Sequence, residues 1–185
     1  MKFGLGVLTL AVALSGCSFT APPYSPQVEN VATLQNANVA ETKIGEFTSA
    51  PKSAQNADPI SLRGSKMHSP ISDSYASYLA DALRQELSLA EKYSESSDTE
   101  ISGTLQKNDL DATGLSQGNG VIEARFMVTR QGQIRYDDTK SAETTWPSSF
   151  LGSVAIPAAI QAYPGLVQKL INALFNDPAF LQALK

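Results

Sequence analysis

Gly120–Tyr136, GVIEARFMVTRQGQIRY, is the stretch that decides the fold. Its first half alternates, because Ile122, Ala124, Phe126 and Val128 are apolar and the positions between them are mostly polar. A period of two is typical of a strand with one buried and one solvated face. Gln131-Gly132 supplies the turn of a β-hairpin. The chain then returns along Ile134–Trp146, whose apolar face comprises Ile134, Tyr136, Ala142 and Trp146. We therefore predict an antiparallel meander with one solvated face.

Strand patterns upstream extend this sheet. Lys43–Phe47 alternates as a short first strand. Glu100–Ala112 alternates and then changes phase, as a bulge or a turn would require. Between these strands, residues 48–70 are rich in Ser, Pro, Ala and Asn, and they predict a long loop with a short strand near Ile60–Leu62.

Two helical segments accompany the strands. Ser72–Tyr93 carries an apolar stripe at helical spacing, and Ser72 or Asp73 is predicted to cap it. The C-terminal part is helical as well, and Pro157 and Pro164 are expected to divide it. The patterns predict an α+β fold, a two-layer sandwich with a small, mostly antiparallel sheet covered on one face by two helices, in the order β-α-β-β-β-α.

Composition narrows the classes of function. The chain has 185 residues, with 14 basic and 18 acidic side chains and a formal net charge of -4. This balance argues against a nucleic-acid partner, because nucleic-acid binders usually carry a basic face. One cysteine and one histidine exclude a disulfide framework, a cysteine-cluster zinc site and a multi-histidine metal site.

The first seventeen residues have the layout of a secretion signal. Met1-Lys2 is a short positive region, and Phe3–Leu14 is an apolar stretch of twelve residues, which is too short to span a bilayer. Leu14-Ser15-Gly16-Cys17 follows, and it resembles the lipobox of bacterial lipoproteins. This resemblance implies that residues 1–16 are a signal peptide and that Cys17 becomes the acylated N-terminus. Acyl chains on Cys17 would then hold the protein on a membrane.

The residues after Cys17 are expected to join this anchor to the folded part. Ser18 stands where an Asp would retain such lipoproteins in the inner membrane, so the resemblance implies an outer-membrane location facing the periplasm. Residues 17–41 hold three prolines and few large apolar side chains, and they are expected to be the lipidated cysteine and a flexible tether. The alternative is a segment packed along the domain surface. Residues 42–185 are expected to form a single α+β periplasmic domain.

No constellation in the sequence supports catalysis, so we expect a protein that is not an enzyme and has no cofactor and no metal. His68 is the only imidazole, and it lies on a predicted loop without a nucleophile motif. Asp109–Gly114 matches the opening of a calcium loop, but Gly120 stands where the bidentate Glu is required. Gly114–Gly120 lacks the lysine and the following helix of a phosphate-binding loop. Ordinary loops explain all three features.

Thr144–Gln168 is a run of 25 residues without a formal charge. Its two prolines, a glycine and several serines argue against a membrane span. One interpretation is a helix buried against the sheet. The other is an apolar patch or groove for a partner or an acyl chain. The residues of this candidate patch are Trp146, Phe150, Leu151, Ile156, Ile160 and Tyr163.

Four stretches carry a wider resemblance over residues 43–184: SYASYLADALRQEL, EISGTL, GVIEARFMVTRQGQIRY and LVQKLINALFNDPAFLQAL. With the lipobox, they resemble small periplasmic lipoproteins, such as the auxiliary lipoproteins of ABC-type lipid transporters and the YajG-like lipoproteins, whose folds are related to the N-terminal domain of TolB. The resemblance implies a non-catalytic accessory or scaffold component of an envelope assembly or transport system, with an envelope protein as its partner. The alternative is a periplasmic module that binds lipid or a cell-wall fragment.

Overall fold

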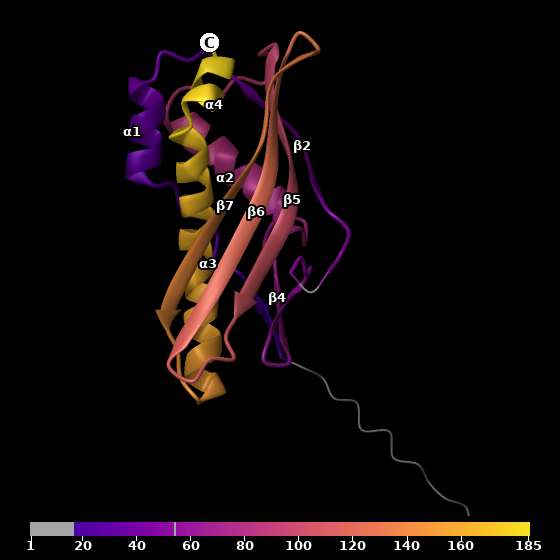
Figure 1. Cartoon of the computed structure of the whole chain (residues 1–185), viewed down its shortest axis with the longest axis vertical. Coiled ribbons are helices and arrows are strands. Elements are labelled where there is room, and N and C mark those ends of the chain that lie inside the picture. The colour runs from indigo at the N-terminus through magenta and orange to yellow at the C-terminus, as the bar shows by residue number, and fades with distance from the viewer. Residues whose placement is uncertain (1–16, 54) are drawn as a thin grey trace, which may run out of the picture.

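The computed structural model describes residues 17–53 and 55–185, which form two sheets and their helices (Figure 1). The larger sheet has the order β2-β5-β6-β7, and the smaller one has the order β1-β4-β3. The strands are β1 (Ser18–Thr20), β2 (Lys43–Ser49), β3 (Ile60–Leu62), β4 (Ser65–His68), β5 (Thr99–Asp111), β6 (Gln117–Arg130) and β7 (Gln133–Pro147). The helices are α1 (Val28–Asn36), α2 (Tyr75–Leu89), α3 (Gly152–Phe175) and α4 (Pro178–Ala183).

The larger sheet is built around the predicted hairpin of β6 and β7. Gln131 and Gly132 have φ angles of 51° and 76°, and both residues of a type I′ turn need such positive values. β5 pairs antiparallel with β6, and only β2 joins parallel, at the outer edge of β5. The predicted strand near Ile60–Leu62 is present as β3. The mostly antiparallel sheet of the prediction is confirmed.

Two irregularities in strand pairing set which side chains are buried. The β5–β6 register shifts between Leu105 and Lys107. The buried apolar residues are odd-numbered up to Leu105 and even-numbered at Leu110, which confirms the predicted change of phase. The β6–β7 register shifts between Val128 and Thr129. Beyond this second bulge, Ile134 turns to the outer face and is 61% exposed, so its predicted place on the same face as Tyr136 and Trp146 is wrong.

α2 and α3 cover one face of the larger sheet (Figure 1). α2 packs against β2 and β5, whereas α3 packs against β6 and β7. Their buried stripes meet the inward-facing residues of β6, which are Ile122, Ala124, Phe126 and Val128. The predicted two-layer fold is thus confirmed. α4 lies in the C-terminal part that was predicted to be helical, whereas α1 is a helix that the sequence patterns did not predict.

Helix boundaries differ from the prediction in three places, and the first is the end of α2, which lies at Leu89 and not at Tyr93. α3 continues through Pro157 and Pro164, so the prediction that they divide the C-terminal part is wrong. Each proline removes one hydrogen bond from the helix, but ten buried side chains along α3 hold it against the sheet. Ser74, and not Ser72 or Asp73, caps α2, because the latter two have φ angles of 50° and 52° and turn the chain before the helix starts.

Residues 18–41 fold onto the domain, and the predicted flexible tether is therefore wrong. β1 pairs parallel with β4, and α1 contacts both α2 and α3. The segment buries four apolar side chains in the core: Ala21, Tyr24, Leu34 and Val39. The alternative, a segment packed along the domain, is what the structure shows.

Glu86 on α2 is a buried side chain that holds residues 18–41 on the domain by hydrogen bonds. Its Oε1 accepts hydrogen bonds from the Tyr24 hydroxyl (2.5 Å), the backbone nitrogen of Gln27 (3.0 Å) and Nδ2 of Asn30 (3.2 Å). Oδ1 of Asn30 in turn accepts from Nδ2 of Asn172 on α3, at 2.9 Å. Burial and the bond to Glu86 raise the pKa of the Tyr24 hydroxyl. One buried carboxylate thus fixes the N-terminal segment across both main helices.

Asp177 docks α4 on β7. Its Oδ2 accepts from the Tyr136 hydroxyl (2.8 Å) and pairs with Nζ of Lys140 (2.7 Å), while Oδ1 accepts from the backbone nitrogen of Ala179 as the helix cap. The rings of Tyr136 and Phe180 meet edge to face, with centroids 5.5 Å apart. The hydrogen bond from Lys140 is the main cause that lowers the pKa of Asp177 to about 2.

This depressed pKa predicts a pH-dependent effect of Asp177→Asn. Because the carboxyl titrates lower in the folded state than its usual 3.8, its pairing with Lys140 stabilises the fold above about pH 4 and is lost as the pH falls toward 2. We expect the variant to be less stable by about 1 kcal/mol at pH 7 in urea denaturation. The difference from the wild type should shrink at pH 2. An equal difference at both pH values would contradict this assignment.

Candidate functional site

Cys17 is the first residue that the structure describes, and it lies against the folded domain. Its side chain is exposed, and its carbonyl oxygen accepts a hydrogen bond of 3.0 Å from the backbone nitrogen of Lys66. β1 begins at the next residue and pairs with β4, so no free segment separates Cys17 from the smaller sheet. The predicted signal peptide, residues 1–16, and with it the rest of the predicted lipobox, lies outside the described residues.

Arg63 ties two loops together near Cys17. It lies in the tight turn between β3 and β4, three positions before Lys66, and has a φ of 48°. Its Nε donates to the carbonyl oxygen of Ala112 at 2.6 Å. Its terminal nitrogens donate to three further carbonyl oxygens, those of Gly114 (3.2 Å), Ser149 (2.9 Å) and Phe150 (2.8 Å). The β5–β6 and β7–α3 connections are thereby held side by side.

We call this part of the molecule the Arg63 end. It comprises Cys17, the Arg63-Gly64 turn, residues 112–118 and residues 147–154. A backbone hydrogen bond of 2.9 Å from Ser148 to Ser116 joins its two loops directly. Figure 1 shows that the Arg63 end lies opposite the tip of the β6–β7 hairpin and α4. The N-terminal attachment point and the two loops therefore share one end of the domain.

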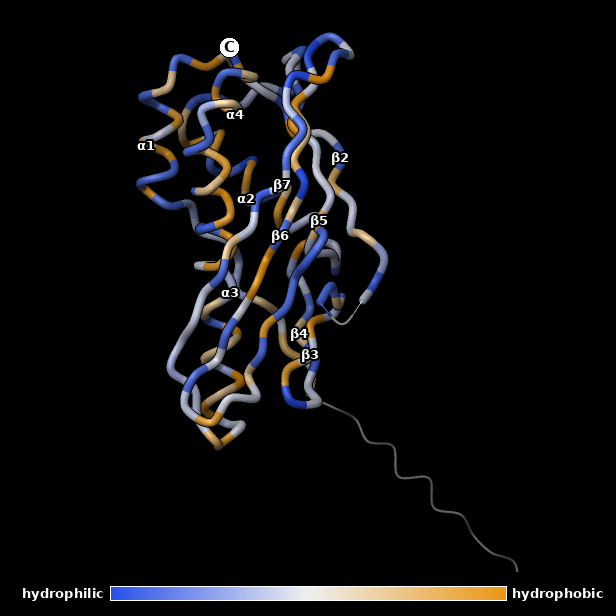
Figure 2. The backbone as a smooth tube through the Cα atoms, in the orientation of Figure 1, coloured by the Kyte–Doolittle hydropathy of each residue, from blue (hydrophilic) through white to orange (hydrophobic). Residues whose placement is uncertain are grey.

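Large apolar side chains are exposed at the Arg63 end. They are four of the seven such side chains in the described part of the chain: Leu115 (73% exposed), Phe150 (74%), Leu151 (56%) and Val154 (51%). Figure 2 shows hydrophobic residues in the loops at this end. Residues 112–122 and 144–168 carry no formal charge, so both loops lack ionisable side chains. A cluster of this kind is typical of an interaction surface.

The structure divides the predicted apolar patch into two groups. Phe150 and Leu151 are exposed at the Arg63 end, and Ile156 is half-buried. The other three belong to the core and are nearly fully buried: Trp146 (8% exposed), Ile160 (7%) and Tyr163 (1%). From Ala155 onward, α3 buries one side of the uncharged run, as one interpretation had it, whereas Phe150, Leu151 and Val154 before it are exposed. No helix within residues 17–53 and 55–185 is long and apolar enough to cross a membrane.

Leu115 and Val154 were missed by the sequence analysis. Leu115 is a lone large apolar residue among the glycines of the β5–β6 connection, and that isolation was the available signal. Val154 lies in the first turn of α3, three positions after Leu151, which is the residue that precedes the helix. Arg63 was missed as well, because backbone carbonyl partners leave no trace in a sequence.

The residues considered for chemistry are not brought together. Nδ1 of His68 lies 2.8 Å from Oδ1 of Asp73 at the surface. Oδ1 of Asp111 accepts a hydrogen bond of 2.8 Å from the backbone nitrogen of Thr113, and this bond closes a local turn. Asp109 lies two residues earlier on β5, where burial raises the pKa of its carboxyl group. The described ranges contain no group of three or more His, Cys, Asp or Glu side chains that could hold a metal ion.

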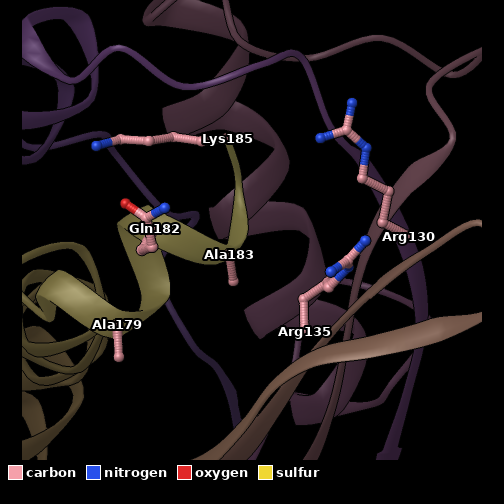
Figure 3. Close-up of a pocket in the computed structure, with 6 residues that line it drawn as sticks. All are labelled: Arg130, Arg135, Ala179, Gln182, Ala183 and Lys185. Atoms are coloured by element: carbon pink, nitrogen blue, oxygen red, sulfur yellow. The ribbon is translucent and has the colours of Figure 1, made fainter.

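A basic cleft lies at the opposite end of the domain, between the β6–β7 hairpin and α4 (Figure 3). Its volume is about 560 Å³, and its lining residues are Arg130, Arg135, Ala179, Gln182, Ala183 and Lys185. Figure 3 shows the Lys185 side chain pointing away from the two arginines. Arg130 is paired with Asp98 at 3.7 Å. The three cations do not converge on one point, so the cleft supports no specific anion site.

Comparison with known proteins identifies the fold. No protein-family model matches the chain, and no curated protein matches it. A protein from Xanthomonas campestris, whose description names the family DUF330, superposes with a TM-score of 0.55 at 12% identity, over 86% of this chain and 96% of that one. The chain shares the fold of this protein. A candidate lipoprotein from Caulobacter crescentus aligns with a TM-score of 0.47 at 10% identity, over 84% of this chain and 96% of its own.

Proposed function

We propose that the chain is a bacterial lipoprotein that is held on the periplasmic face of the outer membrane by acyl chains on Cys17. In this proposal it acts by binding, as a non-catalytic accessory or scaffold component of an envelope assembly or transport system. The observation that carries the proposal is the sequence Leu14–Cys17 after a twelve-residue apolar stretch. A stable anchor needs more than one acyl chain, which the lipoprotein pathway supplies.

The position of Cys17 supports this role. The thiol is exposed, and the next residue already belongs to β1, so acyl chains on Cys17 would hold the smaller sheet directly at the membrane surface. A domain fixed in this way presents its remaining surface to other envelope proteins at a constant height. It does not reach far across the periplasm, as a flexible tether would have allowed.

We propose binding and not catalysis because the hydrogen bonds of the only imidazole, His68, do not form a catalytic arrangement. Within residues 17–53 and 55–185, the hydrogen-bond partner of the His68 ring is Asp73, and no serine or threonine hydroxyl is hydrogen-bonded to that ring. The alternative, a module that binds lipid or a cell-wall fragment between helix and sheet, has less support. Trp146, Ile160 and Tyr163 were expected to line its cleft, and they are packed in the core.

Metabolic labelling with a palmitate analogue tests the anchor. We expect the wild-type chain to incorporate the label in Gram-negative cells and to fractionate with outer membranes. Cys17→Ser should lose the label completely, because the hydroxyl cannot form the thioether. Ser18→Asp is the matched variant for sorting, and it should keep the label but move to the inner membrane. A wild-type chain without label, or a labelled Cys17→Ser variant, would refute the proposal.

A further inference from the structure

We propose that the Arg63 end is a membrane-contacting surface, and that Leu115, Phe150, Leu151 and Val154 enter the interfacial region of the lipid bilayer. The inference rests on the proposed acylation of Cys17 and adds an orientation to it. The domain would stand on the membrane on this end. The β6–β7 hairpin and α4 would then point into the periplasm (Figure 1).

Geometry places the apolar cluster and the anchor at the same end. The carbonyl oxygen of Cys17 is bonded to Lys66, and Arg63 lies three residues earlier, in the turn that starts β4. Arg63 holds the carbonyl oxygens of Gly114 and Phe150 on one guanidinium group. Acyl chains leaving Cys17 therefore start beside the loops that expose the apolar side chains.

The charge pattern of this end suits a bilayer. Neither loop carries a formal charge between residues 112 and 122 or between residues 144 and 168. Asp111, the carboxylate that directly precedes the first loop in the sequence, accepts a hydrogen bond of 2.6 Å from the Thr113 hydroxyl. Lys66, which is exposed on β4, can face lipid phosphates. Bulky apolar side chains with cations beside them, here Lys66 and Arg63, are typical of protein segments that enter the interface.

Arg63 makes the surface ready for this contact. Loop backbone that approaches lipid must have its polar groups satisfied within the protein. The Arg63 guanidinium satisfies four loop carbonyls, and the Ser148–Ser116 bond satisfies another. These five carbonyl groups therefore need no hydrogen bond from water when the apolar side chains enter the interface.

Site-directed spin labelling of the acylated full chain tests the orientation. Because Cys17 is blocked by lipid, a nitroxide can be attached to a new cysteine in Leu151→Cys. Ile134→Cys is the matched control, since Ile134 is also exposed and apolar but lies at the hairpin end. Both proteins are placed in vesicles of phosphatidylethanolamine and phosphatidylglycerol, and acylation is verified by mass spectrometry. We expect the label at 151 to be accessible to oxygen and shielded from a water-soluble nickel chelate, and the label at 134 to show the reverse.

Each other result overturns the inference. Nickel access at 151 equal to that at 134, in acylated protein, would show that the domain is anchored but does not stand on the Arg63 end. Loss of access to both reagents at 151 would mean that another protein or a second copy covers the loops. A chain without acyl groups would refute the proposed anchor, and this orientation with it. As a second readout, Phe150→Ser/Leu151→Ser should raise nickel access at a nitroxide on Leu115→Cys several-fold while acylation is unchanged.

Discussion

Ile160→Asp is expected to unfold the domain. Ile160 is 7% exposed and packs in the core between α3 and the sheet. The substitution removes a buried aliphatic side chain and places a carboxylate among apolar groups, where the described core offers no cation. We expect a loss of more than about 4 kcal/mol, which is comparable to the whole stability of a small domain. Circular dichroism and urea denaturation should show an unfolded or barely folded protein at neutral pH.

Leu151→Asp is the matched variant from the same uncharged run. Leu151 is 56% exposed at the N-terminus of α3, where a carboxylate interacts favourably with the helix dipole. We expect the denaturation midpoint of this variant to stay close to that of the wild type. A folded Ile160→Asp protein, or an unfolded Leu151→Asp protein, would contradict the division of the run into a buried helix and an exposed loop.

This division shows why the sequence could predict that the run is unusual but not what it does. An absence of charge has the same appearance in a buried helix and in an exposed apolar loop. Periodicity does not separate them here, because α3 is largely apolar and two prolines suggested breaks within it. The deciding information is three-dimensional: residues 152–175 lie under β6 and β7, whereas residues 147–151 pass the edge of the sheet and meet Arg63.

The sheet was predictable because its signals are local. Alternation along β6, the Gln131-Gly132 turn and the change of phase in β5 each lie within a few residues, and each is governed by backbone geometry. Ile134 was misplaced because one bulge, which has no sequence signature there, turned it to the other face. Local patterns were therefore enough to predict where the strands run. The face on which a residue near the bulge lies depends on how the two strands pair, which the sequence does not show.

The N-terminal segment was misjudged because it is held by polar residues. Asn30 and Glu86 are types that usually lie at the surface, but here both are buried, and Asn30 and the buried Tyr24 each donate a hydrogen bond to Glu86. Prolines and a low apolar content suggested a tether, but the partners of these residues lie about 60 positions away on α2. Such long-range polar contacts cannot be read from one sequence. This matters for function, because a segment packed on the domain keeps the domain at a fixed position close to Cys17, whereas a flexible tether would let it move away.

Glu86→Ala is expected to release this segment. The substitution leaves the Tyr24 hydroxyl, the Gln27 nitrogen and the Asn30 amide without their shared acceptor, and it opens a cavity beneath α1. Unsatisfied buried donors cost about 1–3 kcal/mol each, partly relieved when the segment moves into water, so we expect a net loss of about 3 kcal/mol. Hydrogen exchange should accelerate across residues 18–36 by more than it does in β6.

Two variants make this result specific. Glu86→Gln keeps an oxygen acceptor for all three donors, and its amide nitrogen takes the place of Oε2, which has no partner among the described atoms, so we expect it to cost less than Glu86→Ala and to leave the segment in place. Glu95→Ala removes an exposed carboxylate and should leave both stability and exchange unchanged. If Glu86→Ala left the amides of α1 as protected as in the wild type, apolar packing of Tyr24 and Leu34 alone would suffice to hold the segment. The buried carboxylate would then have no part in keeping the domain close to Cys17.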